Sequence, residues 1–174
     1  RTGLTFAQGL RFILRQDPNI IMVGEIRDDE TANIAVNAAM TGHLVLSTLH
    51  TNDAATTLPR LLDMGVEPFL IASTINIAIG QRLVRTICPE CRAGKRLTDA
   101  EVVALKSSVP EKFLDGHRDF YVGVGCKVCD NSGYKGRIGI HEVIEMNEQI
   151  RQLIMKRATA SEVREGNASF TFSS

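Results

Sequence analysis

Two short apolar runs, each followed by polar residues, shape the first part of the chain. Ile20–Val23 is continuous and mostly β-branched, and His43–Leu49 is the second run. Between them, residues 30–40 carry a helical pattern whose apolar face consists mainly of small side chains. Strand, helix and strand in this order are typical of a parallel sheet, so the pattern predicts an α/β fold. Because Ile20–Val23 is apolar at every position, it is predicted to be a central strand buried on both faces.

The rest of the chain alternates between helical and extended patterns. The first helix is expected to stop at Asp17-Pro18. Pro59 is expected to kink or divide a helix over residues 53–62, because proline removes a backbone donor and clashes with the preceding turn. Other expected elements are helices over 68–80, from 98 and over 147–158, and strands over 81–85, 120–124 and 137–143. Capping residues are expected at Thr5, at Asp28 or Asp29, at Asn52 or Asp53, at Thr98 and at Asn147.

Polar side chains follow both predicted strands at their C-terminal ends. Glu25 and Arg27 come after the first run, and His50 comes after the second. Parallel strands bring these ends to one edge of the sheet, where α/β folds place their ligand sites. A carboxylate there can hold Mg²⁺ or orient water against a phosphoryl group, and a histidine can donate to a phosphate oxygen. The residues alone leave two alternatives open: Glu25 as a surface residue that caps the next helix, and His50 as a structural residue.

Length and charge set broad limits on function. The chain has 174 residues, enough for one domain with a substantial core or for one and a half small ones. Its 20 basic and 20 acidic residues cancel, so the sequence shows neither a basic stripe for nucleic acid nor an acidic disordered tail. No apolar run approaches the roughly 20 residues that span a bilayer, and the N-terminus lacks the pattern of a signal peptide. These features predict a soluble, cytoplasmic protein that binds no nucleic acid.

Four cysteines form two CxxC pairs, Cys88 with Cys91 and Cys126 with Cys129. Two such pairs in a cytosolic chain are typical of a structural zinc site with four thiolate ligands. The long loop between the pairs opposes binding only weakly, because each doubling of loop length costs about 0.6 kcal/mol. Zinc contributes roughly 10 to 16 kcal/mol at neutral pH, which far exceeds that cost. Two disulfides or four free thiols are the alternatives, and His141 is interpreted as structural because four cysteines already suffice.

Two segments of the chain, Ile13–Asp28 and Thr41–Ala54, closely resemble motifs of one protein family. They resemble the Walker B segment and the histidine box of the secretion ATPases that drive type II secretion and type IV pilus assembly. The resemblance implies a RecA-like P-loop NTPase core that hydrolyses ATP with Mg²⁺ in a hexameric ring. It also implies a peripheral location on the cytoplasmic side of the bacterial inner membrane, where the ring moves a membrane platform protein. The residues that it implies at the nucleotide are Glu25 and His50, as catalytic groups, together with Arg27, Asp28 and His43.

The resemblance extends to the cysteines. Many assembly ATPases of this family carry a tetracysteine insertion, which the related pilus-retraction ATPases generally lack, so a Zn²⁺ site favours the assembly or secretion branch. The implied organisation is the C-terminal half of the ATPase core over 1–87, a zinc-binding subdomain over 88–136, and a C-terminal strand and helix over 137–174. From Gly166 onward the sequence departs from the usual continuation of the family. Other secretion or pilus assembly proteins are the expected partners.

The phosphate-binding pattern GxxxxGK[ST] is absent from the sequence. In the family that loop precedes the segment present in this chain, so the chain is expected to be the C-terminal part of an ATPase domain and inactive alone. Gly24 stands where the usual Walker B pattern has an aspartate. Glu25 is therefore expected to serve as magnesium ligand, as general base or as both. The alternative function is a zinc-stabilised interaction module that binds a partner without turnover.

Overall fold

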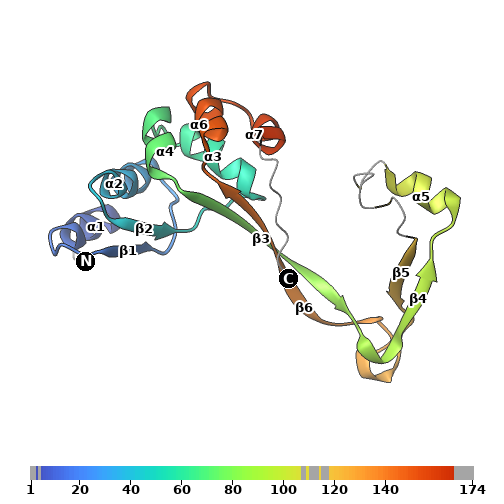
Figure 1. Cartoon of the computed structure of the whole chain (residues 1–174). Helices are drawn as coiled ribbons and strands as arrows, with labels where there is room; N and C mark the ends of the chain where they lie inside the picture. The colour runs from blue at the N-terminus through green and yellow to red at the C-terminus, as the bar shows by residue number, and fades with distance from the viewer. Residues whose placement is uncertain (1–2, 4, 107–108, 110–113, 115–117, 167–174) are drawn as a thin grey trace. The chain divides into compact units, whose positions relative to one another are not determined.

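Helices and strands alternate from α1 to α3 and are mixed along the rest of the chain, as Figure 1 shows. The computed structural model describes residues 3, 5–106, 109, 114 and 118–166. The elements are α1 Phe6–Leu14, β1 Ile20–Val23, α2 Asp29–Met40, β2 Leu44–Ser47, α3 Ala54–Asp63, α4 Pro68–Thr74, β3 Ile77–Ile87, β4 Arg92–Arg96, α5 Asp99–Lys106, β5 Asp119–Gly123, β6 Tyr134–Glu145, α6 Glu148–Met155 and α7 Ala160–Gly166. Two short 3-10 helices, Pro89–Cys91 and Lys127–Cys129, lie at the cysteine pairs.

Two units make up the chain. The larger consists of Arg1–Arg82 and Ile140–Ser174, and the smaller is Leu83–Gly139. The chain leaves the larger unit in β3 and returns to it in β6, and these two strands pair with each other. The larger unit contains the main hydrophobic cluster, and the smaller unit contains the four cysteines.

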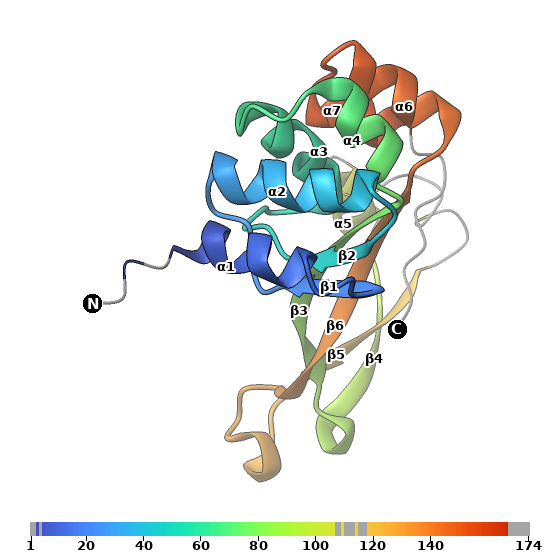
Figure 2. The same ribbon diagram turned by 90° about the vertical axis from the view of Figure 1, so that its left-hand side faces the viewer.

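Strands β1 and β2 are parallel neighbours, with Ile20–Val23 opposite Leu44–Ser47. Helix α2 connects them and packs on β2, and Figure 2 shows it over one face of the strand pair. Its buried face consists mainly of small or β-branched residues: Ala32, Ile34, Ala35, Val36 and Ala38. The predicted α/β arrangement of strand, helix and parallel strand is confirmed.

The prediction that β1 is buried on both faces is wrong for this chain. Ile21 and Val23 are buried, at 3% and 1% exposure, whereas Ile20 and Met22 are exposed at 60% and 80%. Successive side chains of a strand point to opposite faces, so one face of β1 is covered and the other is open. Within the described part of the chain β1 pairs only with β2. An apolar strand sequence therefore marks two faces suited to burial, of which this chain covers one.

Five helices, α1, α2, α3, α5 and α6, begin at predicted capping residues. Each cap accepts a hydrogen bond from the backbone N–H three positions on: Thr5 from Gln8, Asp28 from Thr31, Asp53 from Thr56, Thr98 from Glu101 and Asn147 from Ile150. These bonds satisfy N–H groups that the first turn of a helix leaves without partners. Helix α3 continues through Pro59, so the proline does not divide it.

Two predicted helices extend too far. The helix expected over 68–80 ends at Thr74, and β3 begins at Ile77. The apolar residues there alternate with period two, since Ala78 is buried while Ile77 and Ile79 are exposed. That period and the β-branched side chains favour a strand over a helix. Likewise α6 ends at Met155, short of 158, and is followed by α7, which the sequence pattern did not predict.

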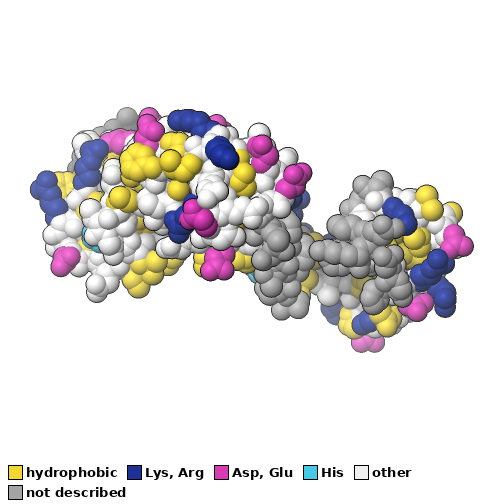
Figure 3. All heavy atoms as spheres, turned by 45° about the horizontal axis from the view of Figure 1, so that its top comes forward, with side chains coloured by type: hydrophobic (Ala, Val, Ile, Leu, Met, Phe, Trp, Pro, Cys, Tyr) yellow, Lys and Arg dark blue, Asp and Glu magenta, His cyan; other side chains and the backbone are white. Residues whose placement is uncertain are grey.

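In the smaller unit, β4 and β5 form an antiparallel pair, with Arg92 opposite Gly123. β4 was not predicted, because its sequence RAGKR has no apolar alternation. Within the described residues, no helix is long and apolar enough to cross a membrane. On the face of the larger unit seen in Figure 3, basic and acidic side chains are interspersed with apolar ones. The expected departure of the tail concerns mainly residues 167–174, which lie outside the described residues.

Candidate functional site

Glu25 and His50 meet at the C-terminal edge of the β1–β2 pair. The His50 Nε2–H donates to Glu25 Oε2 over 2.8 Å. The Nε of Arg27 lies 2.7 Å from the same carboxylate oxygen. Parallel strands therefore bring together an acid, an imidazole and a guanidinium from two separate loops, as the sequence predicted for this edge of the sheet.

Two hydrogen bonds continue the strand pairing beyond β1 and β2 and fix the backbone at this edge. The Ile26 N–H donates to the carbonyl of Thr48 over 2.9 Å. The Thr48 hydroxyl donates to the carbonyl of Gly24 over 2.6 Å. Both bonds flank Glu25, so its backbone is held while its side chain remains free to change partners. No sequence pattern marks Thr48, because its hydrogen-bond partner lies 24 positions away.

The carboxylate of Glu25 is stabilised in its ionised form. The hydrogen bond from His50 lowers the pKa of Glu25 most, and the hydrogen bond and positive charge of Arg27 lower it further. The Glu25 side chain is 36% exposed, whereas His50 and Arg27 are 78% and 69% exposed. An ionised, partly sheltered carboxylate whose two partners are exposed to solvent can accept a cation or a water molecule once those partners turn elsewhere.

A pocket of about 250 Å³ adjoins this cluster. It is lined by Ile26, Arg27, Leu49, His50 and Arg60. Arg60 comes from α3, and no sequence pattern marks it, because only the folding of α3 brings it beside the strand ends. Two guanidinium groups and an imidazole suit the pocket to an anion such as a phosphate.

Asp28 and His43 lie apart from the Glu25–His50 contact. Asp28 caps α2, and the hydrogen bonds from Thr31 lower its pKa. His43 precedes β2, at the opposite end of that strand from His50, where its Nδ1 lies 2.9 Å from the carbonyl of Ala38. The structure therefore brings Glu25, Arg27 and His50 together, whereas a nucleotide-binding role for His43 or Asp28 stays a prediction.

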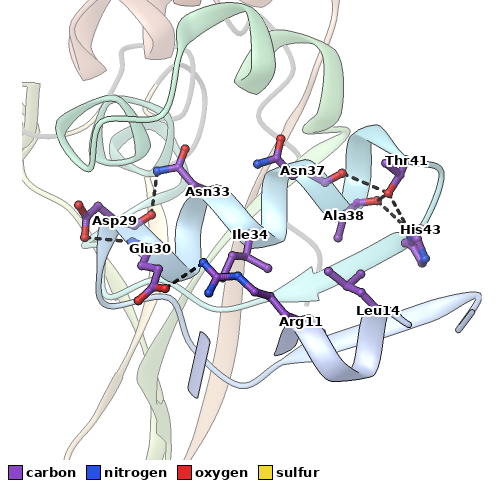
Figure 4. Close-up of a pocket in the computed structure, with 10 residues that line it drawn as sticks. All are labelled: Arg11, Leu14, Asp29, Glu30, Asn33, Ile34, Asn37, Ala38, Thr41 and His43. Carbon is purple, nitrogen blue, oxygen red and sulfur yellow. Dashed lines mark hydrogen bonds and ion pairs between the residues drawn. The ribbon is translucent and has the colours of Figure 1, made fainter. Parts of the chain in front are cut away.

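A larger hollow of about 730 Å³ lies between α1 and α2, as Figure 4 shows. Its lining residues are Arg11, Leu14, Asp29, Glu30, Asn33, Ile34, Asn37, Ala38, Thr41 and His43. An ion pair of 3.0 Å joins Arg11 to Glu30 across it, and His43 is at the far end of α2 from that ion pair. The hollow is thus polar and partly occupied by its own ion pair, and it is separate from the Glu25 cluster.

The four cysteines form the second candidate site. Their sulfur atoms all lie within 4.8 Å of one another, and the shorter separations are 3.9 Å for Cys88–Cys126, 3.8 Å for Cys91–Cys129 and 3.7 Å for Cys126–Cys129. Four sulfurs bound at about 2.3 Å to one tetrahedral ion stand about 3.8 Å apart. The separations are far longer than a disulfide bond, and all four thiols are free. The cluster therefore has the dimensions of a single four-thiolate metal site.

The surroundings of the cysteines also suit bound thiolates. Cys88, Cys91 and Cys129 are buried, and the Cys126 N–H points to the sulfur of Cys129 at 3.3 Å. Burial raises the pKa of Cys129, but N–H groups of Cys126 and Gly133 outweigh it, and the result is a pKa of about 6. At Cys91 burial prevails and raises the pKa to about 11, so the thiols of the cluster differ in how readily they ionise. With four protein ligands, such a site leaves no open coordination position for catalysis.

Solved structures with a similar fold define the class of the larger protein family. The pilus retraction motor PilT with bound ADP matches with a TM-score of 0.58 and 28% identity, over 92% of this chain and 34% of that one. The ATPase DotB of Legionella pneumophila matches with a TM-score of 0.57 and 27% identity, over 93% and 33%. The fold is thus the RecA-like α/β fold of secretion ATPases.

The sequence identifies the family itself. The chain belongs to the Type II/IV secretion system protein family, whose profile matches residues 1–171. "Type II secretion system protein E" of Aeromonas hydrophila is 50% identical over 154 residues, which are 88% of this chain and 30% of that protein. "Type IV pilus assembly ATPase PilB" of Myxococcus xanthus is 48% identical over 163 residues, 94% and 28%. The chain therefore spans less than a third of the length of these curated relatives.

Proposed function

We propose that this chain is the C-terminal part of the ATPase core of a motor subunit for type II secretion or type IV pilus assembly. The observation that carries the proposal is the contact between Glu25 and His50 at the C-terminal edge of two parallel strands. A carboxylate and an imidazole side by side at the edge of a pocket can act together: the carboxylate can polarise water, and the imidazole can contact a phosphoryl group. A module that only binds a partner has no use for this pair.

In this proposal Glu25 holds Mg²⁺ through water or orients the attacking water, and His50 contacts the γ-phosphate of ATP. Arg27 and Arg60 bring positive charge to the pocket beside them. Since the sequence contains no phosphate-binding loop, the loop comes from the remainder of a longer protein. Asp28 and His43 remain proposed nucleotide contacts, in an assembly where a further part of the protein or a neighbouring subunit completes the site.

We also propose that the four cysteines bind one structural Zn²⁺ and that the zinc subdomain is part of Leu83–Gly139. The dimensions of the sulfur cluster support zinc over unpaired thiols. In this proposal the longer protein acts as a hexameric ring at the cytoplasmic face of the inner membrane. Its partners there are a membrane platform protein and other secretion or pilus assembly proteins.

The first test measures magnesium-dependent ATP turnover of the longer protein that contains this chain and a phosphate-binding loop. Glu25→Gln should reduce turnover by about 100-fold or more, because the charge that orients water is lost, while ATP binding survives. His50→Ala should also lower the turnover rate. Glu67→Gln is the matched control, since Glu67 stands before α4 and makes no side-chain capping bond.

Two results would count against the proposal. Turnover unchanged in both variants would remove Glu25 and His50 from the reaction. Zinc without any turnover, in a protein whose phosphate-binding loop is intact, would instead favour the interaction module. Elemental analysis of the same samples should give about one zinc per chain.

A further inference from the structure

The segment that follows His50 is tied to distant parts of the larger unit. Arg82 of β3 donates from Nη2 to the carbonyl of Asn52 over 3.1 Å. The N–H of Ala54 donates to Glu142 Oε2 of β6 over 2.8 Å. Arg82 and Glu142 are 30 and 88 positions away from their partners along the sequence. Both bonds therefore join residues 52–54, which follow His50, to later elements of the fold.

Asp53 makes two kinds of contact with its two carboxylate oxygens. Its Oδ1 accepts from the N–H and the hydroxyl of Thr56, at 2.8 Å and 2.6 Å, and so caps α3. Its Oδ2 lies 2.7 Å from Nη2 of Arg164, a residue of α7. Helix α7 packs on α3, so the ion pair lies at one end of an existing helix contact. Capping of α3 requires only Oδ1, whereas Oδ2 contacts Arg164 of α7.

There is little space for the segment to move independently of β3. A β-carbon added to Gly80 would lie 2.6 Å from the backbone nitrogen of Ala54 and 3.1 Å from the carbonyl carbon of Asp53. Real β-carbons do not approach backbone atoms this closely, so β3 and the start of α3 are in direct backbone contact. A displacement of β3 must therefore displace the start of α3.

We propose that Asp53, Glu142 and Arg164 are positioning residues that couple β3, β6 and α7 to His50. The proposal rests on the proposed ATPase function, because it assigns these residues to the placement of the histidine that contacts phosphate. A shift of the C-terminal elements changes the position of residues 52–54 and, two to four residues earlier, that of His50. In the reverse direction, a change of partner at His50 is transmitted to α7.

The exposure of the Asp53–Arg164 pair favours a geometric role over a stabilising one. The side chains are 23% and 45% exposed. Ion pairs this accessible to water contribute little to stability, because water screens the charges. The same contact still fixes the distance between two helices, which is what a positioning role requires.

The test uses the longer protein with its phosphate-binding loop and compares Arg164→Ala with His50→Ala and with the double variant. Arg164→Ala should lower kcat by about 2- to 5-fold with little change in the KM for ATP, which matches the free energy of roughly 1 kcal/mol or less that a partly exposed ion pair can transmit. In the His50→Ala background the same change should have no further effect, because its target is gone. Asp53→Asn, which can still cap α3, should behave as Arg164→Ala does.

Variants at Thr159 and Glu142 distinguish a positioning effect from a general loss of stability in α7 or β6. Thr159→Ala removes a hydroxyl that accepts from the Glu162 N–H at the start of α7, and it leaves Arg164 in place. Glu142→Gln keeps an oxygen that can accept from Ala54, whereas Glu142→Ala does not. Turnover should be retained in Thr159→Ala and in Glu142→Gln, and reduced in Glu142→Ala.

The outcomes distinguish the two proposals. If the wild-type protein turns over ATP and needs Glu25, but the effects of Arg164→Ala and His50→Ala are independent, the coupling is refuted and the ATPase function stands. If the wild-type protein has no turnover, the proposed function fails. Amide hydrogen exchange in the 174-residue chain then tests whether the Asp53–Arg164 contact holds the start of α3. Exchange at the Ala54 amide should be faster in Arg164→Ala than in the wild type, and unchanged exchange would refute this coupling.

Discussion

Glu101 and Glu162 are two carboxylates in the same local arrangement with different surroundings. Glu101 accepts from the N–H and hydroxyl of Thr98, and Glu162 accepts from the same groups of Thr159. Only Glu101 also contacts an ammonium group, that of Lys95 at 2.6 Å. The hydrogen bond from Lys95 is the largest cause that lowers the pKa of Glu101 from 4.5 to about 2, while Thr98 contributes further.

We therefore expect Glu101 to titrate near pH 2 and the Lys95→Ala variant to titrate at a clearly higher pH. Since the pKa in the folded state is lowered, the contribution of Glu101 to stability is present above about pH 4.5 and is lost as the pH falls toward 2. NMR titration of the side-chain carboxyl carbons would measure both groups in one sample. The Glu162 titration should not move in Lys95→Ala, and an unmoved Glu101 would show that Lys95 does not set its pKa.

At the residue scale, the strand pattern predicted that Glu25 and His50 meet but not how they pair, and His43, which the resemblance also implied at the nucleotide, lies at the other end of β2. Glu25 and His50 follow neighbouring parallel strands, and that topology alone is enough to place them at one edge. The sharing of a single carboxylate oxygen with Arg27 depends on the conformations of exposed side chains, which no sequence pattern specifies. Arg60 and Arg164 were missed for a related reason, because the pocket that Arg60 lines and the carboxylate that Arg164 contacts are formed by residues from other elements of the chain.

At the scale of elements, replacement of glycine by alanine should have opposite effects on stability at two positions. Gly80 in β3 contacts the backbone at the start of α3, whereas a β-carbon at Gly9 in α1 would have no atom within 4 Å. Glycine in a helix interior is unfavourable because a glycine residue loses more conformational entropy on folding than alanine does. At Gly80 the added carbon instead forces two backbone segments apart.

Gly80→Ala should destabilise the larger unit by roughly 1 to 3 kcal/mol, a typical cost of overpacking. Gly9→Ala should stabilise it by about 0.5 to 1 kcal/mol. Urea unfolding of the two variants, followed by far-ultraviolet circular dichroism, gives both signs against the wild type. Equal effects from the two substitutions would contradict the close approach of β3 and α3.

The pattern of apolar residues predicted the elements better than it predicted their limits. Strong caps such as Asp28 and Asn147 fixed helix starts, because a side-chain oxygen there satisfies backbone donors locally. The end of α4 was placed too late, since an apolar segment such as 75–79 fits a buried helix as well as a strand. Strand β4 has no apolar pattern, and its pairing with β5 defines it.

At the scale of the whole molecule, the two units differ in what holds them together. The larger unit has an extended hydrophobic cluster to which all six of its described helices contribute. In the described part of the smaller unit, the buried cluster consists of Cys88, Cys91 and Cys129, with Cys126 packed against it. A unit with so small an apolar core needs another source of stability, which the proposed structural zinc would supply.

Removal of the metal should therefore unfold the smaller unit and leave the larger one folded. A zinc chelator should collapse the dispersed amide NMR signals of the described residues in Leu83–Gly139 and preserve those of β1, β2 and the helices around them. Cys88→Ser should have the same effect without chelator, because Cys88 is fully buried and supplies one of the four sulfurs. Signals that return when zinc is added back would show that the loss is due to the metal.

Ser132→Ala is the control for this experiment, because its hydroxyl bonds to the carbonyl of Cys129 next to the cluster but supplies no ligand sulfur. It should keep its zinc and its signals. If chelation left the smaller unit folded, its stability would come from its strands, and the cysteines would be dispensable. If chelation unfolded both units together, the pairing of β3 with β6 would couple the two units strongly enough to make their unfolding cooperative. Selective unfolding is expected, since the main hydrophobic cluster of the larger unit includes none of the four cysteines.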